Sequence, residues 1–209
     1  MNINKIIAVF SILTIFTLFG CSEDTETTLQ QRNIMLYTED FSDVTNSQVF
    51  NTTNWTNFAE IGTRVWTEQR FPVDGGNGYA QFTSLGTGQL INVGWLISPA
   101  FNMDLQNGEK LTFQAAQRFL RSRENSLELL VSTDYDGINV VNADWINVPV
   151  VVPTPDTQFS NFVNSGVVDL SKYKGNLHFA FKVKGSGTTN SNLAGTYQID
   201  NINIFYPSN

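Results

Sequence analysis

Polar and apolar residues alternate along much of the chain after residue 34, and this alternation restricts the fold more than any other feature. In the segment 111–115, Leu, Phe and Ala alternate with Thr and Gln, and the segments 127–131 and 177–184 follow a similar pattern. Successive side chains of a strand point to opposite faces of a sheet, so a period of two predicts half-buried strands. After residue 34 no run of ten or more residues shows the apolar spacing of an amphipathic helix.

Four further segments have the length and composition of strands. They are residues 78–83, 91–97, 145–152 and 197–206. Turns rich in Gly, Asn and Asp separate the segments. Many short strands at this spacing predict an antiparallel β-sandwich or barrel. The chain shows neither an internal repeat nor a second linker beyond residue 34, so we expect one domain over residues 34–209.

The last predicted strand changes its alternation part of the way along. Tyr197 and Ile199 share one parity, whereas Ile202, Ile204 and Tyr206 share the other. A slip of one residue turns every later side chain to the opposite face, so a β-bulge at residues 200–201 is one prediction. A strand that is buried on both faces would need no bulge, and the sequence does not decide between the two.

Composition and charge exclude several classes of protein. The formal net charge is −7, whereas a sequence-independent nucleic-acid binder needs a basic surface. With one Cys and one His, the chain is neither a disulfide scaffold nor a Cys/His zinc protein. That histidine, His178, follows the apolar Leu177 and is expected to face solvent. The chain also lacks a G-x-S-x-G nucleophile elbow, so histidine-based catalysis is not expected.

The N-terminus has the features of a signal peptide. Lys5 precedes an apolar run over residues 6–19, which is about 21 Å long as a helix at ~1.5 Å per residue. A permanent span needs about 20 apolar residues, so this run is typical of the apolar region of a signal peptide. The run ends in Leu-Phe-Gly-Cys, which resembles a bacterial lipobox with Cys21 as the lipidated residue. A plain secretory signal with an incidental cysteine is the alternative. We assign residues 1–20 to the signal peptide.

Residues 21–33 are expected to form the lipidated cysteine and a flexible polar tether. An acidic cluster over residues 22–26 is similar to the surface-export signal of Bacteroidetes lipoproteins. This similarity implies an outer-membrane lipoprotein that is exposed on the cell surface and held to the membrane by its lipid. A solvated acidic tether with no export role is the alternative.

Several motifs occur in an order that resembles a known family. They are YTEDF at 37–41, GWLISPAF at 94–101, LTF at 111–113, VSTDY at 131–135, VDLSKYKG at 168–175 and IDN at 199–201. The order resembles the choice-of-anchor J and cleaved-adhesin domains of Bacteroidetes surface proteins over about residues 36–206. The resemblance implies an antiparallel jelly-roll β-sandwich of the galactose-binding or MAM type. It also implies a module that adheres or binds a ligand rather than a catalyst.

The same resemblance implies one structural calcium ion between the first and last strands. Its candidate ligands here are Glu39, Asp40 and Asp200. Calcium takes six to eight oxygen ligands from carboxylates, amides and backbone carbonyls. The alternative is that these carboxylates cap turns or face solvent. No other cofactor is expected.

Three aromatic residues are candidates for an exposed platform on which a sugar ring would stack. Trp55 and Trp66 lie in the region 42–77, which reads as long and irregular, and Tyr135 lies on a predicted turn. Each could instead anchor a loop against the edge of the sandwich. The only basic cluster is Arg118, Arg121 and Arg123. It would suit an acidic polysaccharide or a phosphate group, or it would simply balance nearby acids on a solvated loop.

We therefore expect a non-catalytic binding or adhesion lipoprotein whose ligand is a glycan or a surface protein. One alternative is a structural subunit of an outer-membrane surface or uptake complex. The other is a small polysaccharide hydrolase that uses a pair of carboxylates. The candidate carboxylates for such a pair are Glu60, Glu68, Glu124 and Glu128.

Overall fold

The computed structural model describes residues 32–71, 76–188 and 191–208. Within these ranges the regular structure is almost entirely β, the one exception being the short 3-10 helix η1 (Val140–Asn142). None of the helical structure in the described ranges has the length and hydrophobicity needed to cross a membrane. The predicted signal peptide, Cys21 and all but the last two residues of the tether lie outside the described residues.

The larger of two antiparallel sheets has seven strands. They are β1 (Asn33–Glu39), β3 (Thr67–Phe71), β4 (Asn77–Thr83), β7 (Lys110–Arg118), β10 (Val163–Asn164), β11 (Val168–Asp169) and β13 (Thr196–Pro207). Their order is β10-β7-β13-β4-β3, and β1 pairs with β13 while β11 pairs with β7. The neighbours are mostly far apart in sequence, so strands from both ends of the domain meet in one sheet.

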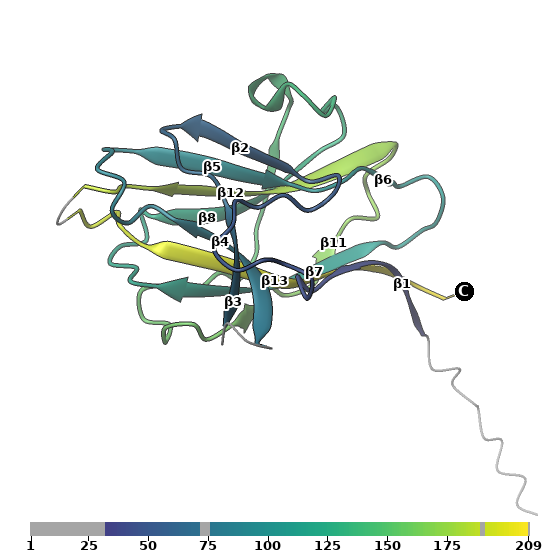
Figure 1. Ribbon diagram of the computed structural model, residues 1–209. Coiled ribbons are helices and arrows are strands. Elements are labelled where there is room, and N and C mark those ends of the chain that lie inside the picture. The colour runs from purple at the N-terminus through teal and green to yellow at the C-terminus, as the bar shows by residue number, and fades with distance from the viewer. Residues whose placement is uncertain (1–31, 72–75, 189–190, 209) are drawn as a thin grey trace, which may run out of the picture. The chain divides into compact units, whose positions relative to one another are not determined.

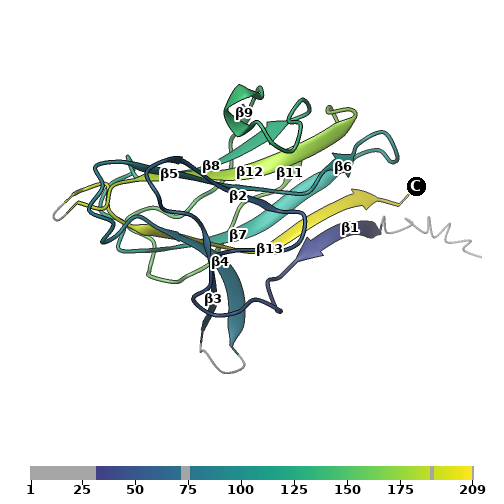
Figure 2. The ribbon, with the colours of Figure 1, turned by 45° about the horizontal axis from the view of Figure 1, so that its top comes forward.

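The smaller sheet has six strands and forms the second layer (Figure 1). They are β2 (Thr56–Ile61), β5 (Asn92–Ile97), β6 (Phe101–Asn102), β8 (Ser126–Ser132), β9 (Ile146–Val148) and β12 (Asn176–Gly185). Their order is β2-β5-β12-β8-β9, with β6 paired to β12. Figure 2 shows the two layers from a second direction, with the β3–β4 hairpin extending below them. The predicted antiparallel β-sandwich is confirmed.

The main core lies between the sheets and follows the alternation seen in the sequence. Leu111, Phe113 and Ala115 of β7 are buried, as are Phe179 and Phe181 of β12. The rings of Phe113 and Phe181 meet edge to face across the two layers, with centroids 4.8 Å apart. Burying one such apolar side chain contributes about 1.5–3 kcal/mol, so this face of each strand holds the layers together.

A second apolar cluster covers the outer face of the smaller sheet. The segment that follows β8 folds back over this face, so that Tyr135 and Trp145 pack with Trp95 of β5. His178 lies beneath this cover, with its Nδ1 2.8 Å from the carbonyl oxygen of Ser98 and its ring against the ring of Tyr135. His178 is therefore half-buried, and the expectation that it faces solvent is wrong.

Strand β13 contains the β-bulge that was one of two interpretations of its sequence. Its register with β7 shifts between Asp200 and Asn203. Asn201 adopts a φ of 50°, a left-handed conformation that asparagine tolerates better than most residues. The bulge turns the side chains over, so that Tyr197 and Ile199 before it and Ile202 after it all reach the main core.

The structure corrects two sequence expectations. The region 42–77 is not irregular throughout, because it contains β2 and β3. The segment 145–152 was expected to be one strand, yet only residues 146–148 pair as β9. Pro149 follows immediately, and proline has no backbone N–H to continue a ladder of hydrogen bonds.

Replacing Gly94 by alanine is expected to destabilise the fold. A Cβ atom at this position of β5 would lie 2.1 Å from Cε2 of the fully buried Phe82. Overpacking a core position costs about 1–3 kcal/mol, so the urea midpoint of unfolding should fall with little change in its slope. Adding Phe82→Leu should recover part of the loss, because the smaller side chain makes room. Strict additivity of the two changes would contradict this account.

Candidate ligand-binding site

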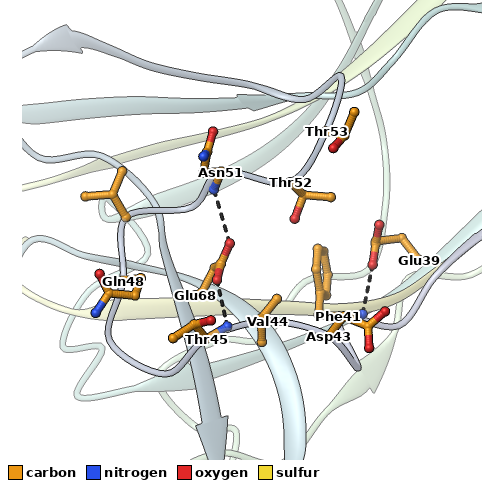
Figure 3. A pocket seen from close by; sticks show the side chains of 11 residues that line it. Glu39, Phe41, Asp43, Val44, Thr45, Gln48, Asn51, Thr52, Thr53 and Glu68 are labelled. Carbon is orange, nitrogen blue, oxygen red and sulfur yellow. Dashed lines mark hydrogen bonds between the residues drawn. The ribbon is translucent and has the colours of Figure 1, made fainter.

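One hollow, which we call the acidic pocket, lies between the end of β1, the segment 41–53 and β3 (Figure 3). It has a volume of about 570 Å³ and contains the carboxylates of Glu39, Asp43 and Glu68. Its remaining polar lining consists of Thr45, Gln48, Asn51, Thr52 and Thr53. The pocket therefore offers many oxygen atoms, and its chemistry depends on how the carboxylates are engaged.

Glu68 holds the wall of the acidic pocket together. Its side chain is only 9% exposed, its Oε2 accepts a hydrogen bond of 2.8 Å from the backbone N–H of Thr45, and its Oε1 accepts one of 3.2 Å from that of Asn51 (Figure 3). The Glu68 carboxylate on β3 thus fixes two points of the segment 41–53. This engagement favours a structural role for Glu68.

Glu39 is engaged in the same way. Its Oε1 accepts a hydrogen bond of 3.0 Å from the backbone N–H of Phe41, and its Oε2 accepts one of 3.2 Å from the Tyr37 hydroxyl. Burial raises the pKa of Glu39, and the charges of Asp40 and Asp43 raise it further. Glu39 and Glu68 therefore both bind backbone groups of their own neighbourhood, which favours a structural role for each carboxylate in the acidic pocket.

The three predicted calcium ligands separate into two groups. Glu39 faces the acidic pocket, whereas Asp40 lies close enough to Asp200 for its charge to raise the pKa of Asp200. Burial is the larger cause of that raised pKa, since Asp200 is 1% exposed at the bulge of β13. Its Oδ2 accepts a hydrogen bond of 2.7 Å from Nδ2 of Asn77.

The Asp40–Asp200 pair is chemically suited to a hard cation. The charge of Asp40 contributes to the raised pKa of Asp200, and the amide nitrogen of Asn77 faces the Asp200 carboxylate. Carboxylates are oxygen ligands of the kind that calcium takes, and further oxygens such as backbone carbonyls are needed to complete the shell. Within the described residues no group of three or more His, Cys, Asp or Glu side chains is placed to hold a metal, so the pair supplies only part of such a site.

The predicted aromatic platform does not exist as expected. Trp66 is fully buried and packs on Phe82, with ring centroids 5.7 Å apart. Tyr135 is buried in the second cluster. Trp55 is half-buried and donates a hydrogen bond of 3.1 Å from Nε1 to the Tyr37 hydroxyl. The reason is that the region around the two tryptophans forms strands, so their rings pack inward instead of standing on a loop.

A second hollow, which we call the aromatic cleft, lies beside the outer face of the larger sheet. It has a volume of about 320 Å³. Its lining residues are Phe71, Asn77, Tyr79, Arg118, Ser160, Phe162 and Gln198. Apart from Arg118, these residues were not candidates in the sequence, because they come from β3, β4, β7, β13 and the segment before β10. Only the strand order brings them together.

The walls of the aromatic cleft are aromatic and its polar lining includes an amide. The rings of Tyr79 and Phe162 meet edge to face with centroids 6.0 Å apart, and Phe71 at the end of β3 is 72% exposed. Gln198 lies between these walls in the sheet, is 1% exposed and donates a hydrogen bond of 3.1 Å from Nε2 to Oε1 of Gln81. The Oε1 of Gln198 has no partner within the described ranges.

Arg118 is the only charged side chain among the described residues that line the aromatic cleft. Burial raises the pKa of Tyr79, and the nearby positive charge of Arg118 partly opposes that rise. In the sheet, Arg118 of β7 lies opposite Thr196 of β13, and Thr196 lies opposite Thr83 of β4. Thr83 is six residues beyond Asn77 on β4. At ~3.3 Å per residue the backbones of Arg118 and Asn77 are therefore about 20 Å apart along the strands, so the lining is elongated.

Removing the Glu68 carboxylate should loosen the segment 41–53 without changing the sandwich. Glu68→Ala leaves two backbone N–H groups without their acceptor, which costs about 1–3 kcal/mol. We expect faster proteolysis within this segment and a lower unfolding midpoint. Asp43→Ala is the matched control, because Asp43 lines the same pocket and its side chain has no hydrogen bond within the described ranges. Equal protease sensitivity of the two variants would show that Glu68 is not the clamp.

Comparisons with solved structures identify the fold. The K1 cleaved adhesin domain of Lys-gingipain from Porphyromonas gingivalis W83 is similar with a TM-score of 0.51 and 19% identity, over 83% of this chain and 97% of that chain. The K2 cleaved adhesin domain of Lys-gingipain is similar with a TM-score of 0.54 and 16% identity, over 83% and 99%. These similarities establish a jelly-roll β-sandwich fold.

Comparison with protein families gives a narrower assignment. A search among curated proteins found no match. The family model described as "Domain of unknown function (DUF5017)" matches residues 100–207, just over half of the 209-residue chain. The matched part runs from β6 to the end of β13 and so includes Arg118, Phe162 and Gln198 of the aromatic cleft. The resemblance to choice-of-anchor J domains stays a prediction. The chain belongs to the DUF5017 family.

Proposed function

We propose that this protein is a non-catalytic binding protein of the cell surface and that its aromatic cleft receives a glycan. The observation that carries the proposal is the composition of the cleft: three aromatic side chains beside side-chain amides on a rigid sheet. A sugar ring has an apolar face that packs on an aromatic ring and hydroxyls that bond to amides. Both kinds of contact are available within one elongated hollow.

The fold supports binding over catalysis. Two of the similar solved structures are cleaved adhesin domains, and the same scaffold would present a recognition surface here. Two of the four carboxylates considered for a hydrolase are engaged otherwise. Glu60 forms an ion pair of 2.9 Å with Lys182 and accepts a hydrogen bond from Trp95, and Glu68 holds backbone groups. We retain, as part of the proposal, display at the outer membrane through a lipid on Cys21.

Calcium is the second part of the proposal. Asp40 and Asp200 would supply carboxylate oxygens, and an ion there would neutralise the repulsion between the two carboxylates. Because Asn77 donates a hydrogen bond to Asp200 and also lines the aromatic cleft, the ion would fix one end of the cleft. Its role would be structural.

Glycan binding is testable with a matched pair of aromatic variants. We expect the purified protein to bind one or more polysaccharides in an array, and Phe162→Ala to weaken that binding about tenfold or more, since ~1.4 kcal/mol is tenfold in affinity. Phe205→Ala is the control, because Phe205 is a half-buried phenylalanine of β13 that belongs neither to the main core nor to the lining of the cleft. An array on which the protein binds nothing would reject a glycan ligand and favour a protein partner.

Calcium should raise the temperature of unfolding relative to EDTA. A ligand that binds only the folded state at 100 times its dissociation constant adds about 2.7 kcal/mol. At this size that shift is roughly 5–10 °C. Asp200→Asn should abolish the calcium-dependent difference, whereas the exposed control Asp156→Asn should keep it. The same unfolding temperature in calcium and in EDTA would remove calcium from the proposal while leaving glycan binding intact.

A further inference from the structure

We infer that the glycan received by the aromatic cleft is anionic, and that Arg118 recognises its carboxylate or sulfate groups. This inference rests on the proposed function, because it names the class of glycan for the same cleft. It begins from the charge of the cleft. Among the described lining residues Arg118 is the one charged group, although the chain as a whole has a formal net charge of −7.

The Arg118 guanidinium has no protein partner within the described ranges. The ion pair found there joins Lys182 to Glu60, on the other sheet. Arg118 makes no side-chain hydrogen bond with a described residue and is exposed. Five N–H donors therefore remain free, in a planar fork that matches a carboxylate or sulfate group with two parallel hydrogen bonds.

A neighbouring ring holds the guanidinium in place. The centre of the Arg118 guanidinium lies 5.3 Å from the centroid of the Phe119 ring. Phe119 has a φ of 61°, an unfavourable left-handed conformation for a bulky residue, and its ring packs edge to face on Phe159. The strained turn at the end of β7 thus places a ring beside the charge. A positioned guanidinium loses less freedom when it binds an anion.

The other two arginines of the basic cluster do not share this position. Arg123 lines a separate hollow near Tyr197 and Pro153, and Arg121 lines neither that hollow nor the aromatic cleft. The cluster that the sequence indicates is therefore divided by the fold. Of the three arginines, Arg118 alone lines the aromatic cleft, so the negative charge of the glycan is recognised at one point.

Asp200 is an acidic group that adjoins the Asn77 end of the cleft. Asp200 reaches the lining only through its hydrogen bond from Asn77, and it is buried. Asp200 is four residues from Thr196, the partner of Arg118 on β13, so the backbones of Asp200 and Arg118 are about 13 Å apart along the strands at ~3.3 Å per residue, which exceeds the Debye length of about 8 Å at physiological salt. An anionic group bound at Arg118 is therefore little affected by Asp200.

Two matched pairs of polymers test the inference on the purified protein. Dextran sulfate is compared with dextran, and polygalacturonate with its methyl ester, so each pair differs mainly in charge. We expect one or both anionic polymers to bind at least tenfold more tightly than their neutral partners. The overall negative charge of the protein works against non-specific adsorption of these polyanions.

Arginine variants then locate the recognition. Arg118→Gln should weaken binding of the anionic polymer about 10- to 100-fold and leave the unfolding temperature unchanged. Arg118→Lys keeps the charge but loses the planar fork of N–H donors, so its affinity for the anionic polymer should fall between that of the unmodified protein and that of Arg118→Gln. Arg121→Gln is the control, because Arg121 lies outside the cleft, and it should bind like the unmodified protein.

The outcomes separate this inference from the proposed function. Equal binding of charged and neutral polymers, lost in Phe162→Ala, would keep the glycan cleft and overturn the anionic class. Anionic binding that survives Arg118→Gln but is lost in Phe162→Ala would overturn the role of Arg118. Binding of no glycan, in this test or on the array, would overturn the proposed function and this inference together.

Discussion

The structure depends on the double pairing of strand β13. Along one edge it pairs with β7 over almost its whole length, and along the other it pairs first with β4 and then with β1. The bulge at Asp200 and Asn201 lies where the partner changes from β4 to β1. One strand therefore joins the start, the middle and the end of the domain, and both the aromatic cleft and the Asp40–Asp200 pair include a residue of this strand.

The position of the bulge explains why those sites differ. Before it, Gln198 faces outward between Gln81 and Ala116 and contributes to the aromatic cleft. At the bulge, Asp200 is buried beside Asn77 and near Asp40. Gln198 and Asp200 thus lie two residues apart on β13. The amide of Gln198 makes a neutral hydrogen bond, whereas the carboxylate of Asp200 is suited to a cation. The local backbone, more than the residue types, decides which chemistry each position can perform.

Sequence alone was sufficient where one strand buries one face. The alternation in residues 111–115 and 177–184 predicts the core correctly, because a period of two in these segments indicates a strand with one buried face. Prediction from sequence failed near Trp66, because the Asn, Thr and Gly residues in this region are typical of loops. The backbone N–H of Trp66 donates instead to the Asn57 side chain, a contact between β2 and the start of β3 that no local pattern indicates.

The aromatic cleft could not be predicted for a related reason. Phe71, Tyr79 and Phe162 are spread over about 90 positions, and they meet only because β13 separates β4 from β7 in the sheet. Lateral strand order is a property of the folded sheet, and neither propensity nor periodicity contains it. The acidic residues near Phe41 were recognisable as candidates, yet whether each faces the acidic pocket or Asp200 depends on the turn after β1.

The pairing of the first described strand with the last has a mechanical consequence. Asn33 lies opposite Pro207, about 30 Å along β13 from Gln198 at ~3.3 Å per residue. A pull on the N-terminal side of the domain, opposed by a ligand held at the cleft, acts parallel to β1 and β13. The hydrogen bonds that join β1, over Asn33–Glu39, to β13 would then carry the force together instead of breaking one after another. Such a geometry resists shear between the first and the last strand of the domain.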